Sequence, residues 1–128
     1  MDRNQLVALR PLIKKAKVNE STNAIEQFQN ETLRPIIKLQ HELWIAWLQL
    51  HLKKYKINLK DLEMVKQMEC IQSLIGKEKD IKNQCVGMVC GHFTLEEFAF
   101  YQTAIAAINK RIVIMVIERL QSVLPLAE

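Results

Sequence analysis

Residues 35–56 read PIIKLQHELWIAWLQLHLKKYK, and this stretch decides the fold class. Apolar side chains recur three and four positions apart along two neighbouring stripes, which is the spacing of a helical face. The stripes comprise Ile36, Gln40, Leu43, Trp47 and Leu50, and Ile37, Trp44, Leu48, His51 and Tyr55. A face this wide is typical of a helix packed against two neighbours. The stretch therefore predicts a long core helix that begins at Pro35, since proline is tolerated in a first helical turn.

The rest of the chain continues the helical pattern. Only 3 Gly and 3 Pro occur in 128 residues, too few for the many turns of an all-β fold. Further helices are predicted over 59–75, capped by Asn58 and stopped by Gly76, and over 77–90. Their expected inward residues are Leu62, Val65, Met68, Ile71 and Ile75, and Ile81, Cys85, Met88 and Val89.

The last predicted helix covers 95–124, and its 30 residues would reach roughly 45 Å. A compact globule of this size is only about 36 Å across. We therefore expect an all-α fold, an elongated antiparallel bundle of four to five main helices with a long C-terminal helix. It forms a single domain, with a less regular N-terminal arm over 1–31 and the bundle core over 32–124.

A homodimer is expected through this last helix. Residues 112–117, IVIMVI, are apolar on every side, so the helix should be buried all round, by its own core and by a second copy. Trp44 and Trp47 form one broad aromatic patch, for which core packing is the default and an interface anchor the alternative. The predicted interface residues are Ile112, Val113, Met115, Val116, Ile117, Trp44 and Trp47.

Composition narrows the function classes. The net charge of +4 permits a nucleic-acid partner without implying one, and no binding motif accompanies the lysine clusters. Solvated helix faces explain the lysines better, and weak nucleic-acid binding is the minor alternative. The clusters are Lys14, Lys15 and Lys17; Lys53, Lys54 and Lys56; and Lys77, Lys79 and Lys82. Without a signal peptide, a membrane-spanning run or a C-x-x-C pair, we expect a cytoplasmic protein with reduced thiols.

Residues 87–101, GMVCGHFTLEEFAFY, bring a thiol, an imidazole and two carboxylates together. Most of them have a structural interpretation. Thr94 and Glu97 fit a capping box, and Phe93 with Phe98 would form its hydrophobic staple. Gly91 fits a left-handed helix stop, and Glu96 fits the preference for acids in a first turn. Cys90 and His92 are left as weak catalytic candidates, with a buried, inert thiol the favoured interpretation.

Metal and cofactor sites are not expected. The chain has no E-x-x-H and no H-x-x-x-H pattern, and His41 and His51 are ten positions apart, on different sides of one helix. No Gly-rich phosphate loop is present.

One local sequence occurs twice. LRPLIK at 9–14 is nearly repeated by LRPIIK at 33–38, and both prolines fit helix entries. Two short matches are too little for a duplicated domain.

Three segments carry a family resemblance: FQNETLRPIIKLQHEL, GMVCGHFTLEEFAFY and INKRIVIMVIERLQS. They resemble the LRP-x-I-K-L-Q, G-M-x-x-G-x-F-T-x-E-E and N-K-R segments of a family of small uncharacterised bacterial helical proteins. Some members carry the label "glyoxalase". Metal-dependent glyoxalases use paired βαβββ modules with His and Glu ligands on strands, which this sequence does not match, so we interpret the label as an inherited name.

The sequence thus favours a non-enzymatic helical protein that acts by self-association and partner binding. The alternative is a small enzyme that uses Cys90 and His92, with Glu96 or Glu97 nearby.

Overall fold

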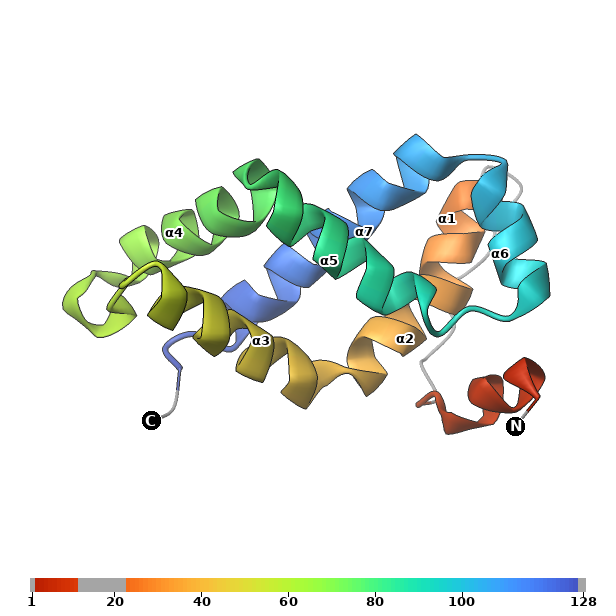
Figure 1. The fold of residues 1–128 in the computed structure, drawn as a ribbon, viewed down its shortest axis with the longest axis horizontal. Helices are drawn as coiled ribbons and strands as arrows, with labels where there is room; N and C mark the ends of the chain where they lie inside the picture. Colours follow the sequence, from red (N-terminus) through yellow and green to blue (C-terminus); the bar gives the residue numbers. More distant parts are fainter. Residues whose placement is uncertain (1, 12–22, 127–128) are drawn as a thin grey trace.

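The computed structural model describes residues 2–11 and 23–126, and within these ranges the chain is helical without a strand (Figure 1). The all-α, elongated bundle is confirmed. Its α-helices are α1 (Ala24–Phe28), α2 (Arg34–Leu39), α3 (His41–Lys54), α4 (Met64–Lys77), α5 (Lys79–Cys90), α6 (Leu95–Gln102) and α7 (Ile105–Ser122). Three further turns are η1 (Arg3–Leu9) and η3 (Leu59–Asp61), which are 3-10 helices, and η2 (Gln29–Leu33), which is a π-helix.

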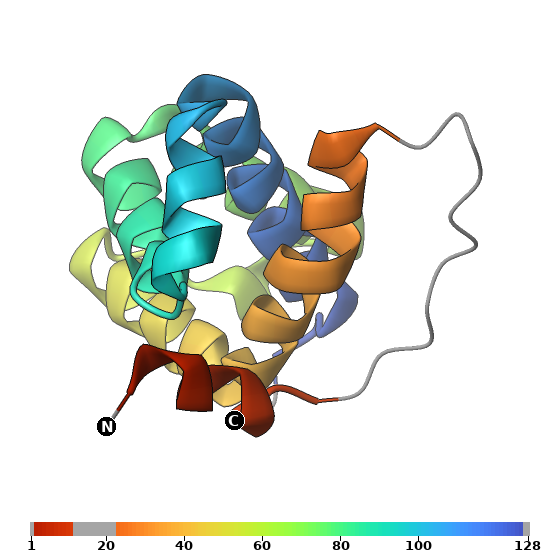
Figure 2. The same ribbon diagram turned by 90° about the vertical axis from the view of Figure 1, so that its right-hand side faces the viewer.

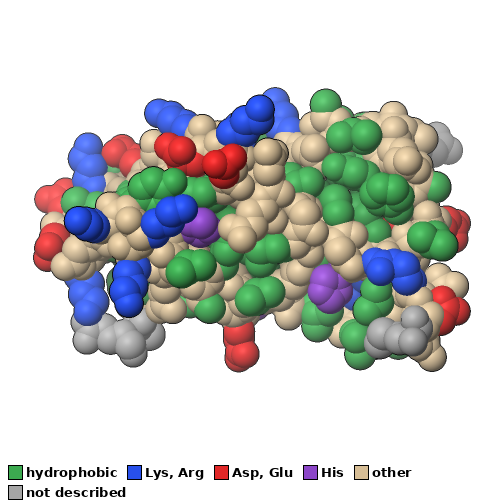
Figure 3. Space-filling model, viewed as in Figure 1, with side chains coloured by type: hydrophobic (Ala, Val, Ile, Leu, Met, Phe, Trp, Pro, Cys, Tyr) green, Lys and Arg blue, Asp and Glu red, His purple; other side chains and the backbone are tan. Residues whose placement is uncertain are grey.

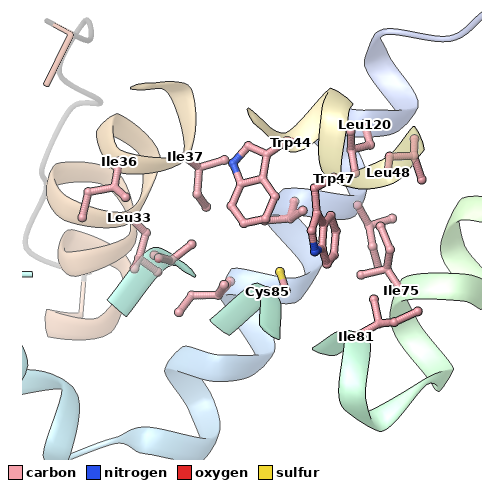
Figure 4. Packing of buried hydrophobic residues seen from close by; sticks show 14 of the residues in the cluster. Leu33, Ile36, Ile37, Trp44, Trp47, Leu48, Ile75, Ile81, Cys85 and Leu120 are labelled. Atoms are coloured by element: carbon pink, nitrogen blue, oxygen red, sulfur yellow. The ribbon is translucent and has the colours of Figure 1, made fainter. Parts of the chain in front are cut away.

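Helix α7 is the centre of the core. It packs against α4 and α5 on one side and against α2 and α3 on another, while α1 and η2 lie alongside it (Figure 2). Figure 4 shows Trp44 and Trp47 of α3 converging with Ile75 and Cys85 on this centre. Each fully buried large apolar side chain stabilises the fold by about 1.5–3 kcal/mol. The fully buried members include Leu33, Ile36, Trp44, Leu48, Ile71, Ile75, Cys85, Val89, Ile108, Ile112, Val116 and Leu120.

The single helix expected over 95–124 is wrong. It is divided into α6 and α7, which meet at an angle of 111°. The hydroxyl of Thr103 donates to the carbonyl of Phe100 (2.6 Å) and closes the last turn of α6. Ala104 then leaves the helical region at φ −150° and ψ 48°. Because the bend holds neither Gly nor Pro, the local sequence gives no warning of it.

Tertiary contacts hold this bend in place. The hydroxyl of Tyr101 on α6 donates to Oδ1 of Asn109 on α7 (2.6 Å), bridging the two helices. The 18 residues of α7 fit within the bundle, so the length of this helix is not what makes the molecule elongated.

The helix expected from Pro35 to about Lys56 is present but kinked. It begins as α2 at Arg34, turns at Gln40 (φ −88°, ψ 12°) and continues as α3. The buried side chain of Gln40 donates from Nε2 to the carbonyl of Met88 (2.9 Å), which fixes the kink against α5. Among the expected inward residues, Ile36, Ile37, Gln40, Trp44, Trp47, Leu48 and His51 are buried, whereas Leu43, Leu50 and Tyr55 are exposed.

The next predicted helix starts later than expected. Asn58 caps the short η3, accepting from the N–H of Lys60, and α4 begins only at Met64. The expected inward face of this helix is confirmed for Ile71 and Ile75 only. Gln67, Ile71, Leu74 and Ile75 face the core, while Leu62, Val65 and Met68, expected inside, are exposed.

Gly76 does not stop the helix, because it lies inside α4, which ends at Lys77. In α5, Ile81, Cys85 and Val89 are buried as expected, and Met88 is half-buried.

No single helix in the described ranges combines the length and the apolar composition needed to cross a membrane. Only when α6 and α7 are taken together as one bent pair are they long enough and apolar enough.

Candidate functional site: the corner between α5 and α6

The turn at residues 91–94 joins α5 to α6, and a capping box begins α6 as predicted. Oγ1 of Thr94 accepts from the N–H of Glu97 (3.1 Å), and Oε1 of Glu97 accepts from the N–H of Thr94 (2.9 Å). Two otherwise unpaired N–H groups of the first turn are satisfied reciprocally. Thr94 is buried, so water could not replace its hydroxyl without a rearrangement.

Two other expectations for this corner are wrong. Gly91 has φ −60° and ψ −18°, an ordinary right-handed conformation, so no left-handed stop ends α5. Phe98 is 42% exposed and does not hold the buried Phe93 in place. The ring of Phe93 lies 5.5 Å from that of Phe28 and 5.7 Å from that of Tyr101, so it anchors the corner to α1 and α6.

An arginine from the N-terminal segment completes the capping box. Arg10 donates from Nη1 and Nη2 to the two carboxylate oxygens of Glu97 (2.7 and 2.8 Å). The Arg10 and Glu97 side chains are 6% and 17% exposed. Bidentate pairs of this kind are among the strongest hydrogen bonds in proteins. Glu97 thus caps the start of α6 and also binds the N-terminal segment through Arg10.

The same segment also satisfies the end of α5. Arg10 Nη2 donates to the carbonyl of His92 (2.8 Å), and Arg3 donates from Nε and Nη2 to the carbonyls of Phe93 and Gly91 (both 2.7 Å). Three consecutive carbonyls beyond the helix end therefore receive guanidinium N–H groups. The C-terminal end of a helix carries unpaired carbonyls and partial negative charge, so two cations stabilise it. We call Arg3, Arg10, Thr94 and Glu97 the arginine clamp.

Charge in the clamp follows from these contacts. Burial pushes the pKa of Glu97 upward. The hydrogen bonds from Arg10, the N–H of Thr94 and the Thr32 hydroxyl, with the positive charge of Arg10, outweigh it, so the pKa lies below its ordinary value. Burial also lowers the pKa of His92, and the charges of Arg10 and Arg3 add to the effect. The clamp therefore favours an ionised Glu97 and a neutral His92.

The surroundings of Cys90 do not favour a thiolate. The Cys90 thiol contacts the Tyr101 hydroxyl, and burial raises its pKa although that hydrogen bond opposes the effect. Nδ1 of His92 is buried without a hydrogen-bond partner among the described residues. A nucleophilic cysteine must be a thiolate near neutral pH, which requires a lowered pKa. This thiol is shifted in the opposite direction.

A hollow beside the corner in the described part of the chain is lined by only some of the candidate residues. It has a volume of about 380 Å³ and is lined by Glu96, Glu97, Thr94, Phe28 and residues of η1. Neither Cys90 nor His92 lines it. Glu96 and Glu97 therefore share this hollow with each other but not with Cys90 or His92.

The predicted interface residues lie inside the chain's own core. Ile112, Val116, Ile117, Trp44 and Trp47 are at most 5% exposed. They have no surface left for a second copy, and core packing accounts for their apolarity. Val113 and Met115 are half-buried. The core therefore accounts for five of the seven predicted interface residues, and an interface through this helix stays a prediction only for Val113 and Met115.

The remaining candidate groups are the lysine clusters and the possible metal ligands. Lys53, Lys54, Lys56, Lys77 and Lys79 are exposed and Lys82 is half-buried, whereas Lys14, Lys15 and Lys17 lie outside the described residues. Over residues 2–11 and 23–126, no three His, Cys, Asp or Glu side chains are grouped as metal ligands would be.

Sequence reasoning missed Arg3 and Arg10, which lie 88 and 87 positions from their partners Gly91 and Glu97. No local pattern predicts such contacts. The one local signal was the position of Arg10, which ends the helical segment η1 and stands directly before Pro11.

No protein-family model matches the chain, and no curated protein or solved structure matches it either.

Proposed function

We propose that the protein is a non-enzymatic helical protein that acts by self-association. The observation that carries this proposal is an exposed apolar stripe on α2 and α3, formed by Leu39, Leu43, Ala46 and Leu50. The three leucines are 37%, 53% and 60% exposed. Figure 3 shows hydrophobic side chains gathered on the surface over α3. Within α3, Leu43, Ala46 and Leu50 are three and four positions apart, which is the spacing of a helix-pairing seam, and Leu39 lies on α2 just before the kink at Gln40.

The occupant we propose is the same stripe of a second copy. In an antiparallel pair about a two-fold axis, Leu39 faces Leu50 of the copy and Leu43 faces Ala46. The two central contacts of the seam then each pair a large side chain with a small one, which permits close packing near the two-fold axis. Glu42 lies near the start of α3, and Lys53 and Lys54 lie in its last turn. Antiparallel pairing brings the acidic end of each helix toward the basic end of the other.

The enzyme alternative is less well supported. It requires an activated thiol, and burial raises the pKa of Cys90. Alkylation followed by peptide mapping across a pH series tests this point. We expect Cys90 to react only above the ordinary thiol pKa of about 8.5. Rapid modification of Cys90 at neutral pH would restore the catalytic hypothesis.

The self-association proposal is tested by sedimentation of three proteins at micromolar concentration. We expect the wild type to be a dimer and Leu43→Glu a monomer, because a carboxylate would be buried in the seam. Leu95→Glu is the matched control, since Leu95 is 75% exposed on α6, away from the stripe. It should remain a dimer. A monomeric wild type, or a dimeric Leu43→Glu, would refute the proposal.

A further inference from the structure

A second group of arginines lies outside the clamp, at a hollow of about 330 Å³ between α7 and the η2–α2 segment. Arg34 and Arg119 line this hollow, together with Gln29, Ile37 and Met115. Arg111 joins them, since its Nη1 donates to Oε1 of Gln29 (2.6 Å). The three guanidinium groups come from two elements that lie side by side in Figure 2. We call this the arginine hollow.

The π-helical turn η2 builds one wall. Its hydrogen bond runs from the N–H of Arg34 to the carbonyl of Gln29, five residues back. Because the turn is wider than that of an α-helix, Arg34 lies one turn above Gln29 on the same side of the helix. In an α-helix, Leu33 would occupy that position, but here Leu33 is fully buried in the core. Single π-turns inside helices are rare and frequently lie at functional sites.

The opposite wall is one face of α7. Arg111, Met115 and Glu118 are spaced by four and three positions, so they lie along a single stripe, with Arg119 next to it. Nη1 of Arg119 lies 3.1 Å from Nδ1 of His41, which accepts if the ring is neutral and protonated at Nε2.

The side-chain partners of Arg111 and Arg119 are not carboxylates. The partners of Arg111 and Arg119 are an amide oxygen and an imidazole nitrogen. Within the described ranges, no carboxylate lies at ion-pair distance from Arg34, Arg111 or Arg119. Glu118 lines the hollow without pairing with them. Arg34, Arg119 and Glu118 line the hollow itself, which gives it one net positive charge. Arg111, held beside the hollow by Gln29, raises the net charge of the region to two.

We propose that the arginine hollow binds a small phosphate monoester. A phosphate monoester carries up to two negative charges at neutral pH, which matches the two net positive charges of the region. Planar guanidinium groups bind phosphate oxygens in pairs. The phosphoryl group contacts Arg34 and Arg119, and the organic part contacts Ile37 and Met115. A volume near 330 Å³ is at the small end of the range for small-molecule sites.

The test titrates the full-length protein with phenyl phosphate, inorganic phosphate and benzoate at low salt, followed by NMR of the arginine Nε–H and Gln29 amide signals. We expect saturable shifts with phenyl phosphate. Inorganic phosphate, which lacks the apolar part, and benzoate, which carries one charge, should bind more weakly. The absence of saturable shifts at millimolar phenyl phosphate would overturn the proposal, as would equal affinity for benzoate.

Two variants and a control locate the site. Arg34→Gln and Arg119→Gln should each weaken phenyl phosphate binding roughly tenfold or more, because each removes charge-assisted hydrogen bonds. Lys66→Gln removes an exposed charge from α4 and should bind like the wild type. Arg34 makes no side-chain hydrogen bond within the described structure, so Arg34→Gln remains informative even if Arg119→Gln fails to fold. Unchanged affinity in Arg34→Gln would refute the site.

Discussion

Arg10 and Arg34 occur in the same local sequence, Leu-Arg-Pro, and have opposite surroundings. Arg10 is nearly buried, pairs in a bidentate manner with Glu97 and donates to the carbonyl of His92. Arg34 is exposed at the rim of a hollow and has no carboxylate at ion-pair distance in the described structure. The proline differs as well, because Pro11 follows the end of η1 whereas Pro35 lies in the first turn of α2.

The difference shows that an arginine can stabilise the fold in one place and, in another, keep a charge that is free to bind a ligand. The charge of Arg10 is compensated within the chain, and η1 is fixed to the α5–α6 corner by it. The charge of Arg34 is not compensated. An uncompensated arginine contributes little to folding and can attract an anion.

The largest expected effect is the loss of Arg10. Arg10→Ala should destabilise the protein by about 3 kcal/mol, because a partly buried Glu97 and the carbonyl of His92 would lose their partner. Urea unfolding monitored by circular dichroism measures the change. Arg3→Ala is the comparison variant. It should cost less, because Arg3 donates to carbonyls and compensates no buried charge.

An effect of Arg10→Ala within the error of the measurement would show that the N-terminal segment does not rest on the corner in solution.

Acid should weaken the clamp in two steps. The folded-state pKa values of His92 and Glu97 are both lowered, so the folded protein binds fewer protons than the unfolded chain. The stability they contribute is complete above their ordinary values of 6.5 and 4.5. It is lost as the pH falls through the folded values, and the loss begins below 6.5 for His92 and below 4.5 for Glu97. Urea unfolding across this pH range measures the loss.

In Arg10→Ala the acid-induced loss below pH 4.5 should shrink, because the ionised form of Glu97 is no longer favoured by a guanidinium. Equal losses in the variant and the wild type would contradict the assignment of the low-pH step to this pair.

Removal of the cap should have a smaller effect. Thr94→Ala should cost about 1 kcal/mol, since one N–H of the first turn of α6 loses its acceptor. Thr94→Ser is the matched control, because it keeps the hydroxyl and should recover most of the stability. A Thr94→Ala variant as stable as the wild type would mean that another group satisfies the N–H of Glu97.

Local chemistry explains which features could be predicted from the sequence. The capping box of Thr94 and Glu97 needs only two residues three apart, and the all-α fold needs only periodic apolar residues and few breakers. The bend at Thr103 and Ala104 was missed because it depends on Tyr101 reaching Asn109 across two helices. The inward face of α4 was predicted in part, since Ile71 and Ile75 are buried as expected while Val65 and Met68 are exposed. Leu62 lies outside the helix, because residues 59–61 form a 3-10 turn capped by Asn58 and α4 begins only at Met64.

The candidate site was harder to predict than the fold. The sequence places Cys90 close to His92, and adjacency in sequence suggested a shared chemistry. In the folded chain Cys90 contacts Tyr101. The arginines of the clamp and of the hollow come from segments separated by more than 70 positions from their partners. Composition and spacing do not encode such pairs.

The smallest expected effect completes the comparison of the two Leu-Arg-Pro arginines. Arg34→Ala should change the free energy of unfolding by no more than about 0.5 kcal/mol, since exposed side chains without specific contacts contribute little. Any change should be stabilising at low salt, because it relieves repulsion among the guanidinium groups of the hollow, and it should fade as salt screens those charges. Urea unfolding of the variant and the wild type at two ionic strengths measures both points. A loss comparable to that of Arg10→Ala would mean that Arg34 is engaged within the folded chain and that its charge is not free for a ligand.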